Sequence, residues 1–103
     1  MQTYHFYESD KPQKKFYVKF INSDSGREKK VYFGAAGMSD MTQHKDEDRK
    51  ANYIRRHQAR EDWTNLNKAG TWSRYILWGE PTMRASIKNM EKMFDIRIIK
   101  KKK

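Results

Sequence analysis

The sequence predicts an α+β fold: a three- or four-stranded, mainly antiparallel sheet with three helices on one face, in the order β-β-β-α-α-α-β. Apolar and polar residues alternate through the first third of the chain, which is the period of strands. Further on, apolar residues recur every three or four positions, which is the period of helices. The 103 residues have room for a single core. We therefore expect one domain over residues 1–99 and a basic tail over residues 100–103.

Strands are expected at both ends of the domain. Residues 16–21 and 31–35 alternate most clearly, and the turn-forming residues 22–26 join them as a hairpin. A weaker alternation over residues 3–7 predicts a strand before the hairpin. The isoleucine-rich residues 96–99 predict a final strand that returns the chain to the sheet.

Three helices are expected between the third strand and the last. The first begins at the acidic residues 46–48, which suit the positive end of a helix, and runs to about Arg60. After a loop over residues 63–70, the segment 72–78 is apolar nearly all round and should be the most buried helix. Thr82 is suited to cap the third helix. The predicted core gathers the apolar residues on inward faces: Phe16, Val18, Phe20, Val31, Phe33, Trp72, Ile76, Met83, Ile87, Met90, Phe94 and Ile98.

The charge of the chain points to its partners. It has 23 Lys and Arg against 13 Asp and Glu, so its net charge is +10 and its pI about 9.9. A surplus of this size makes polyanions the expected contacts, whereas a purely solubilising surface charge is the alternative. No apolar run approaches the roughly 20 residues of a membrane-spanning helix, and the first residues lack the layout of a signal peptide. We expect neither membrane contact nor secretion.

Candidates for catalysis or metal binding are weak, and the absence of cysteine excludes disulfides and thiolate metal sites. Asp40 and residues 46–48 could hold magnesium with His44 as a base, but a helix start also explains the acids. The glycines of residues 34–37 lack the Lys-Ser/Thr of a phosphate-binding loop. No pair of histidines has the spacing of zinc ligands: His5, His44 and His57. We therefore expect no enzyme, no cofactor, no metal and no small-molecule substrate.

The second face of the predicted sheet mixes aromatic and basic residues. Because side chains alternate along a strand, six of them share this face: His5, Tyr7, Tyr17, Lys19, Lys30 and Tyr32. Such a face can stack the bases of single-stranded nucleic acid among basic side chains. Similar faces also occur without any ligand or covered by a protein partner, and the sequence leaves these alternatives open.

A basic stripe runs along the first predicted helix. Arginines at helical pitch suit phosphate contacts, because each guanidinium is planar and permanently charged; a solvated helix face is the alternative. The opposite side, with Ala51 and Ile54, is a weak core face. The stripe falls within about 100° of arc and comprises Lys45, Arg49, Asn52, Tyr53, Arg56 and Arg60.

The lysine tail could be a localisation signal, a DNA-neutralising arm or a solubility device. Together with the stripe and the sheet face, it completes the set of candidate nucleic-acid-binding residues: Tyr17, Lys19, Lys30, Tyr32, Lys45, Arg49, Asn52, Arg56, Arg60, Lys100 and Lys101.

An ordered series of short motifs between Phe33 and Phe94 covers about 60% of the chain. The motifs are Phe33-Gly34, Ser39-Asp40, His44-Lys45-Asp46, Arg56-His57, Trp72-Ser73-Arg74, Leu77-Trp78 and Pro81-Thr82. They resemble a family of small basic domains of unassigned activity, found mostly in large double-stranded DNA viruses of algae and amoebae, the nucleocytoplasmic large DNA viruses. The resemblance implies a viral origin and a place in the virion or in the host cytoplasm or nucleus. It implies no role for any individual residue, because the family has no assigned activity.

Two functions follow as hypotheses. In the first, a non-enzymatic viral protein binds nucleic acid, preferably DNA, mainly through the phosphate backbone, in genome packaging or expression. In the second, it is a virion structural protein, a minor capsid or adaptor element that contacts acidic protein surfaces. Location in purified particles, in the shell or with the genome, discriminates between them.

Overall fold

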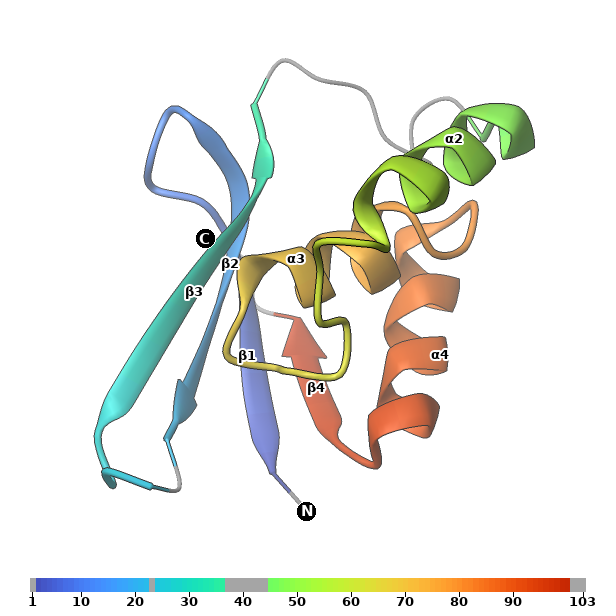
Figure 1. Cartoon of the computed structure of the whole chain (residues 1–103). Coiled ribbons are helices and arrows are strands. Elements are labelled where there is room, and N and C mark those ends of the chain that lie inside the picture. The colour runs from blue at the N-terminus through green and yellow to red at the C-terminus, as the bar shows by residue number, and fades with distance from the viewer. Residues whose placement is uncertain (1, 23, 37–44, 101–103) are drawn as a thin grey trace.

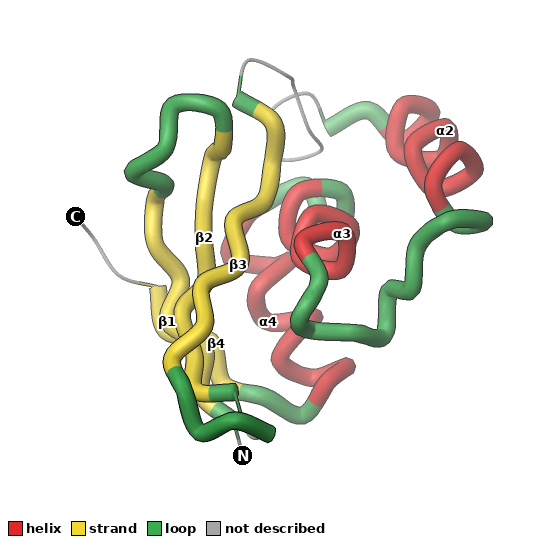
Figure 2. The backbone as a smooth tube through the Cα atoms, turned by 60° about the vertical axis from the view of Figure 1, so that its left-hand side comes forward, coloured by secondary structure: helices red, strands yellow, loops and turns green. Residues whose placement is uncertain are grey.

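The computed structural model describes residues 2–22, 24–36 and 45–100. Figures 1 and 2 show this part from two directions as a four-stranded sheet with its helices on one side. The strands are β1 (Thr3–Glu8), β2 (Lys14–Ile21), β3 (Glu28–Ala35) and β4 (Arg97–Lys100). The helical elements are α2 (Glu47–His57), α3 (Ala69–Trp72), the π-helical turn η1 (Ser73–Leu77) and α4 (Met83–Phe94). The predicted α+β class and element order are confirmed.

The sheet has the strand order β3-β2-β1-β4. β1 pairs antiparallel with β2, and β2 antiparallel with β3, as the predicted hairpin requires. β4 runs parallel to β1, with Tyr4 opposite Ile98. The helices carry the chain across one face of the sheet to its other edge, where β4 enters beside β1. The sheet is therefore mixed, and β1 is an interior strand.

The core lies between the sheet and the helices. Phe6 and Phe33 of the sheet and Trp72 and Met90 of the helices are fully buried. The ring centroids of Phe33 and Trp72 lie 6.1 Å apart, so the two layers meet through these rings. Aromatic side chains of this size remove a large apolar area from water, which is how a short chain sustains a core.

The predicted core needs two corrections. Four predicted members lie at its border and are only partly buried: Phe16, Met83, Ile87 and Phe94. Four buried hydrophobic residues are absent from the prediction: Tyr4, Phe6, Leu77 and Ile96. Two of these, Tyr4 and Phe6, belong to β1, whose short alternation is weak in the sequence, whereas its interior position in the sheet buries both side chains.

The short buried helix begins earlier than predicted and changes its winding. It starts at Ala69, inside the segment predicted as a loop, and becomes π-helical after Trp72. The Trp78 N–H donates to the Ser73 carbonyl, five residues back, at 3.0 Å. The wider turn brings residues five apart to the same side, so Leu77 is buried along with Trp72.

Side-chain caps start the two longer helices. Asp46 accepts from the backbone N–H groups of Asp48 and Arg49 at 3.0 and 3.3 Å, and Thr82 accepts from the Ala85 N–H at 3.2 Å. The predicted Thr82 cap is confirmed, and so is the predicted helix start at the acidic residues 46–48, where Asp46 is the capping residue. α2 ends at His57 rather than near Arg60, because the next residues form a turn.

Candidate nucleic-acid interface

The predicted binding residues fall in three separate places. Four lie on the sheet face that none of the described helices covers (Figure 2), which we call the open face: Tyr17, Lys19, Lys30 and Tyr32. Five lie on α2 or beside its ends: Lys45, Arg49, Asn52, Arg56 and Arg60. Lys100 ends β4 on the helix side, where it lines a hollow with Arg84 and Lys88 of α4. Lys101 lies outside the described residues.

A ladder of three tyrosines crosses the open face. The strand register sets Tyr7, Tyr17 and Tyr32 side by side. The Tyr7 and Tyr17 rings are 4.9 Å apart between centroids with an interplanar angle of 14°, and the Tyr17 and Tyr32 rings are 5.0 Å apart. Two nearly parallel rings with centroids 4.9 Å apart cannot lie side by side in one plane, because their edges would overlap. The Tyr7 and Tyr17 rings are therefore stacked face to face. Their faces are turned to each other rather than to solvent.

Lysines cover part of the same ladder. The Lys11 Nζ lies 4.1 Å from the centre of the Tyr32 ring, and Lys30 lies 5.4 Å from the centre of Tyr17. The Tyr32 hydroxyl donates to Asp10 Oδ1 at 2.9 Å, and this hydrogen bond raises the pKa of Tyr32. The rings of the ladder therefore contact one another and nearby lysines, and the hydroxyl of Tyr32 is hydrogen-bonded within the protein. A flat platform for stacking bases needs ring faces turned outward, and this ladder turns few of them that way.

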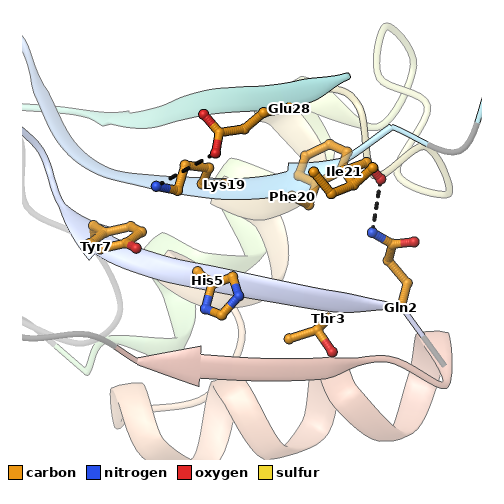
Figure 3. A pocket seen from close by; sticks show the side chains of 8 residues that line it. All are labelled: Gln2, Thr3, His5, Tyr7, Lys19, Phe20, Ile21 and Glu28. Atoms are coloured by element: carbon orange, nitrogen blue, oxygen red, sulfur yellow. Dashed lines mark hydrogen bonds and ion pairs between the residues drawn. The ribbon is translucent and has the colours of Figure 1, made fainter. Parts of the chain in front are cut away.

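A shallow hollow of about 480 Å³ lies on the open face beside the ladder (Figure 3). His5, Tyr7 and Lys19 are among the residues that line it. The Lys19 Nζ lies 3.7 Å from Glu28 Oε1, so a carboxylate partly neutralises the cation that an anionic ligand would need here. The hollow is less suited to phosphate than its composition suggests.

A second concave site lies between α2, η1 and the open end of the β2–β3 hairpin, where β2 begins and β3 ends. It measures about 410 Å³. We call it the α2 groove. Its lining combines basic, aromatic and small side chains from four parts of the chain: Lys15, Gly34, Ala35, Tyr53, Arg56, His57, Arg60, Ser73, Leu77 and Trp78.

Stacked aromatic rings attach α2 to the rest of the molecule. The Tyr53 and Trp78 rings are stacked, with centroids 4.5 Å apart and an interplanar angle of 6°. The Tyr53 ring is also stacked on that of His57, with centroids 4.4 Å apart. The Arg74 Nη1 donates to the Trp78 carbonyl at 3.1 Å, which fixes the base of this aromatic column. Burial, with a contribution from the Glu61 carboxylate, raises the pKa of Tyr53 to about 12. Its phenol is therefore neutral at ordinary pH.

The inward side of α2 differs from the one predicted. Tyr53 lies in the middle of the basic stripe, and it is this residue that packs on Trp78. None of the residues of α2 is buried, and Ala51, on the predicted core face, is exposed. A large ring with a stacking partner buries more area than the Ala51 and Ile54 side chains offer. The stripe therefore borders a groove instead of facing open solvent along its whole length.

Only the C-terminal half of the stripe reaches the groove. Arg56 and Arg60 line it, whereas Lys45, Arg49 and Asn52 do not. The Asn52 Oδ1 accepts from Arg55 Nη2 at 2.9 Å. Among the described residues, no carboxylate forms an ion pair with Arg56 or Arg60, and both are exposed. Lys15, which sequence reasoning missed, joins them from β2. Nothing in its alternating strand pattern signals this position.

Gly34 shapes the floor of the groove. Its φ of +81° is a left-handed conformation that glycine adopts readily. A Cβ at this position would lie 2.7 Å from Leu77 Cδ1 and 3.2 Å from Lys15 Cβ. Any side chain would therefore collide with the wall that η1 forms.

The metal and catalytic alternatives gain no support within residues 2–22, 24–36 and 45–100. No group of three or more His, Asp or Glu there could hold a metal ion. His5 lies on the open face and His57 in the α2 groove, on opposite sides of the sheet. Asp46 caps α2. Asp40 and His44 lie outside the described residues. None of the helices in the described part is long and apolar enough to cross a membrane.

The matches to known proteins cover the first half of the chain. Searches of curated proteins and of solved structures found none that is similar. A comparison with protein families matches residues 4–57, from β1 to the end of α2, to the family of unknown function DUF5754. This segment contains the tyrosine ladder and the groove residues Lys15, Arg56 and His57, and it ends before Arg60 and Trp78. Because the match spans just over half of the residues, the chain belongs to the DUF5754 family.

Proposed function

We propose that this protein binds nucleic acid, mainly through the phosphate backbone, and catalyses no reaction. The observation that supports this proposal most is the convergence of cations on the α2 groove. Arg56 comes from α2, Arg60 from the turn that follows it and Lys15 from β2, and all three line one concavity. The chain as a whole carries a net charge of +10.

The convergence argues against a merely solvated helix face. A solvated face needs no lysine from a distant strand, and its cations usually have acidic neighbours along the helix. A concave site with low-dielectric walls also focuses the field of its charges and raises the local concentration of anions. Planar guanidinium groups at its rim suit phosphate oxygens, which they can bind in a bidentate manner.

The viral resemblance gives this proposal a setting. We place the protein in a large double-stranded DNA virus, in genome packaging or expression, within the virion or the host cytoplasm or nucleus. Its presence with the genome rather than in the shell of purified particles is the expected result.

The salt dependence of binding tests the proposal. Log K against log salt should fall linearly, with a slope of about −0.9 per phosphate contacted on duplex DNA and about −0.7 on single strands. Fluorescence anisotropy with labelled DNA and RNA from about 50 to 200 mM salt covers the informative range. A flat dependence, or no binding at the lowest salt, contradicts the proposal.

The tail offers an internal comparison. A cation that the fold holds in place loses less conformational entropy on binding than one that it does not hold, and α2 and β2 hold Arg56 and Lys15 at the groove. Arg56→Ala/Arg60→Ala should therefore reduce affinity more than deletion of residues 101–103. A larger loss on tail deletion contradicts the assignment to the groove.

The open face favours a second candidate, a virion structural or adaptor protein that contacts acidic protein surfaces. Tyrosines dominate it, with lysines lying over their rings, and tyrosine is enriched in protein–protein interfaces. Recovery of the protein in the shell, with affinity for nucleic acid insensitive to Arg56→Ala/Arg60→Ala, would favour this candidate.

A further inference from the structure

His57 lines the α2 groove together with the cations that the proposed function uses. We infer that His57 is a phosphate-binding residue of this groove in its protonated form, so that affinity for nucleic acid rises as the pH falls. This inference rests on the proposed function and adds to it a binding residue and a dependence on pH. Three properties of His57 carry it: its place in the groove, the charges around it and the state of its ring nitrogens.

The groove holds His57 close to the place where a phosphate would bind. Arg56 precedes it in α2, Arg60 follows in the next turn, and Lys15 comes from β2. The stack on Tyr53, at 4.4 Å between centroids, fixes the position of the imidazole. Because the concavity measures only about 410 Å³, a phosphate inside it lies within Coulombic reach of this ring.

The cations around His57 make its protonation depend on the ligand. Lys15, Arg56 and Arg60 line the same concavity, and Arg74 of η1 adds a positive charge near the Tyr53 ring. Their repulsion disfavours a further positive charge on the imidazole of the free protein. A bound phosphate cancels part of this repulsion. Protonation of His57 and binding of phosphate therefore favour each other, because such coupling is reciprocal.

Other groups favour the protonated ring. His57 is the last residue of α2, where the partial negative charge of the helix end attracts cations. Its ring lies against the face of Tyr53, whose π electrons also attract a cation. The Glu61 carboxylate adds a negative charge near the same tyrosine. The surroundings of His57 thus contain charges of both signs, and a bound phosphate adds to the side that favours the proton.

The ring nitrogens of His57 differ from those of His5. In the part of the chain that the structure describes, none of the hydrogen bonds involves the His57 ring, which packs through its face. His5 lies on the open face, and its Nδ1 is buried without a partner, so a proton there would create a buried charge. Histidine is the side chain that ordinarily changes its charge between about pH 5 and 8. Of these two histidines, His57 is the one suited to bind a phosphate as the pH falls.

The test measures affinity at about pH 5.5 and 7.5. The probe is a labelled oligothymidylate of about 15 nucleotides, because thymine neither gains nor loses a proton in this range. Its ends are hydroxyls, since a terminal phosphate would titrate near pH 6. The wild-type protein should bind about 2- to 5-fold more tightly at the lower pH, which is the strength of one partly exposed ion pair. His57→Gln should bind nearly equally at the two pH values and more weakly than the wild type at the lower one.

The other two histidines supply matched controls, because the chain has three. His5→Gln and His44→Gln should each keep the dependence of the wild type on pH. The slope of log K against log salt gives a second readout. In the wild type it should be larger in magnitude at the lower pH by up to about 0.7, the value for one phosphate contact on a single strand. A dependence on pH that survives in His57→Gln overturns the inference, whichever control removes it.

Proton uptake by the wild-type protein keeps the inference testable if His57→Gln does not fold. Because protonation and binding favour each other, oligothymidylate added at about pH 7 should move the NMR signals of the His57 ring C–H groups toward their low-pH positions. The signals of the His5 ring should stay in place. Binding that leaves the His57 signals unmoved overturns the inference.

The inference and the proposed function fail in different ways. Arg56→Gln/Arg60→Gln should weaken binding at both pH values. Binding that depends on these arginines and is equal at the two pH values overturns the inference alone. Absence of binding at both pH values overturns the proposed function, and this inference with it.

Discussion

α2 and α4 have similar lengths and different tasks. They contain 11 and 12 residues, and each begins at a side-chain cap, Asp46 or Thr82. α4 buries Ser86 and Met90 against the rest of the molecule, whereas α2 buries none of its residues. Figures 1 and 2 both show α3 between the sheet and α2. One helix builds the core, and the other carries arginines to the rim of a groove.

The difference teaches how this small domain separates stability from binding. Changes in the core that α3, η1 and α4 share should unfold the protein. Changes in α2 should alter the groove and leave the sheet intact, because α2 is attached mainly through the stack of Tyr53 on Trp78.

The largest effect is expected from Trp72→Ala. The Trp72 ring is fully buried between Tyr4 and Phe33, and its Nε1–H donates to the Leu66 carbonyl at 2.9 Å. The substitution should lower the free energy of unfolding by about 3–5 kcal/mol, a large part of the 5–15 kcal/mol typical of a domain. Urea denaturation followed by circular dichroism measures the loss. A change below about 1 kcal/mol would contradict the burial of this ring.

Tyr53→Ala should have a smaller and more local effect. Loss of the stack on Trp78 removes about 0.5–1.5 kcal/mol of ring–ring interaction. Hydrogen exchange of α2 amides should accelerate, while β1 and β2 stay protected. Met90→Ala in α4 is the matched control and should lower global stability by about 2–5 kcal/mol. Equal loss of protection in β1 for the two variants would show that α2 is part of the cooperative core.

The smallest effects are expected at the two caps. Thr82→Ala should lower the free energy of unfolding by about 1 kcal/mol, because the Ala85 N–H loses its acceptor. Asp46→Ala removes the acceptor of two N–H groups but should mainly fray the start of α2. Thermal unfolding measures the first effect and amide exchange the second. If Asp46→Ala lowered the free energy of unfolding more than Thr82→Ala does, α2 rather than α4 would be the helix that stabilises the core.

The sequence predicts the parts of this fold that rest on regular patterns. The alternation of Phe16, Val18 and Phe20 and the helical spacing of Met83, Ile87 and Met90 are long enough to identify their elements. The strand 3–7 is also predicted, but its interior position is not, because pairing with β4 depends on the route of the whole chain.

The groove could be predicted only in part. Arg56 and Arg60 stand out as a stripe at helical pitch. Lys15 does not, because its approach depends on the left-handed turn of β3 at Gly34. The helical pitch places Tyr53 in the same stripe, but its packing depends on Trp78, whose position follows from the π-helical turn. Such a turn has no periodic signal in a sequence.

The most direct test of the account compares two pairs of cations. Arg56→Ala/Arg60→Ala and Arg84→Ala/Lys88→Ala each remove two exposed positive charges, the first from the α2 groove and the second from α4. Affinity for labelled nucleic acid is measured against salt for both. The variant that lacks the groove arginines should bind more weakly than the variant of α4. Its slope of log K against log salt should be smaller in magnitude by about 1–2, since each lost phosphate contact lowers that slope by about 1. Equal losses from the two pairs would contradict the account, because net charge alone would then explain binding.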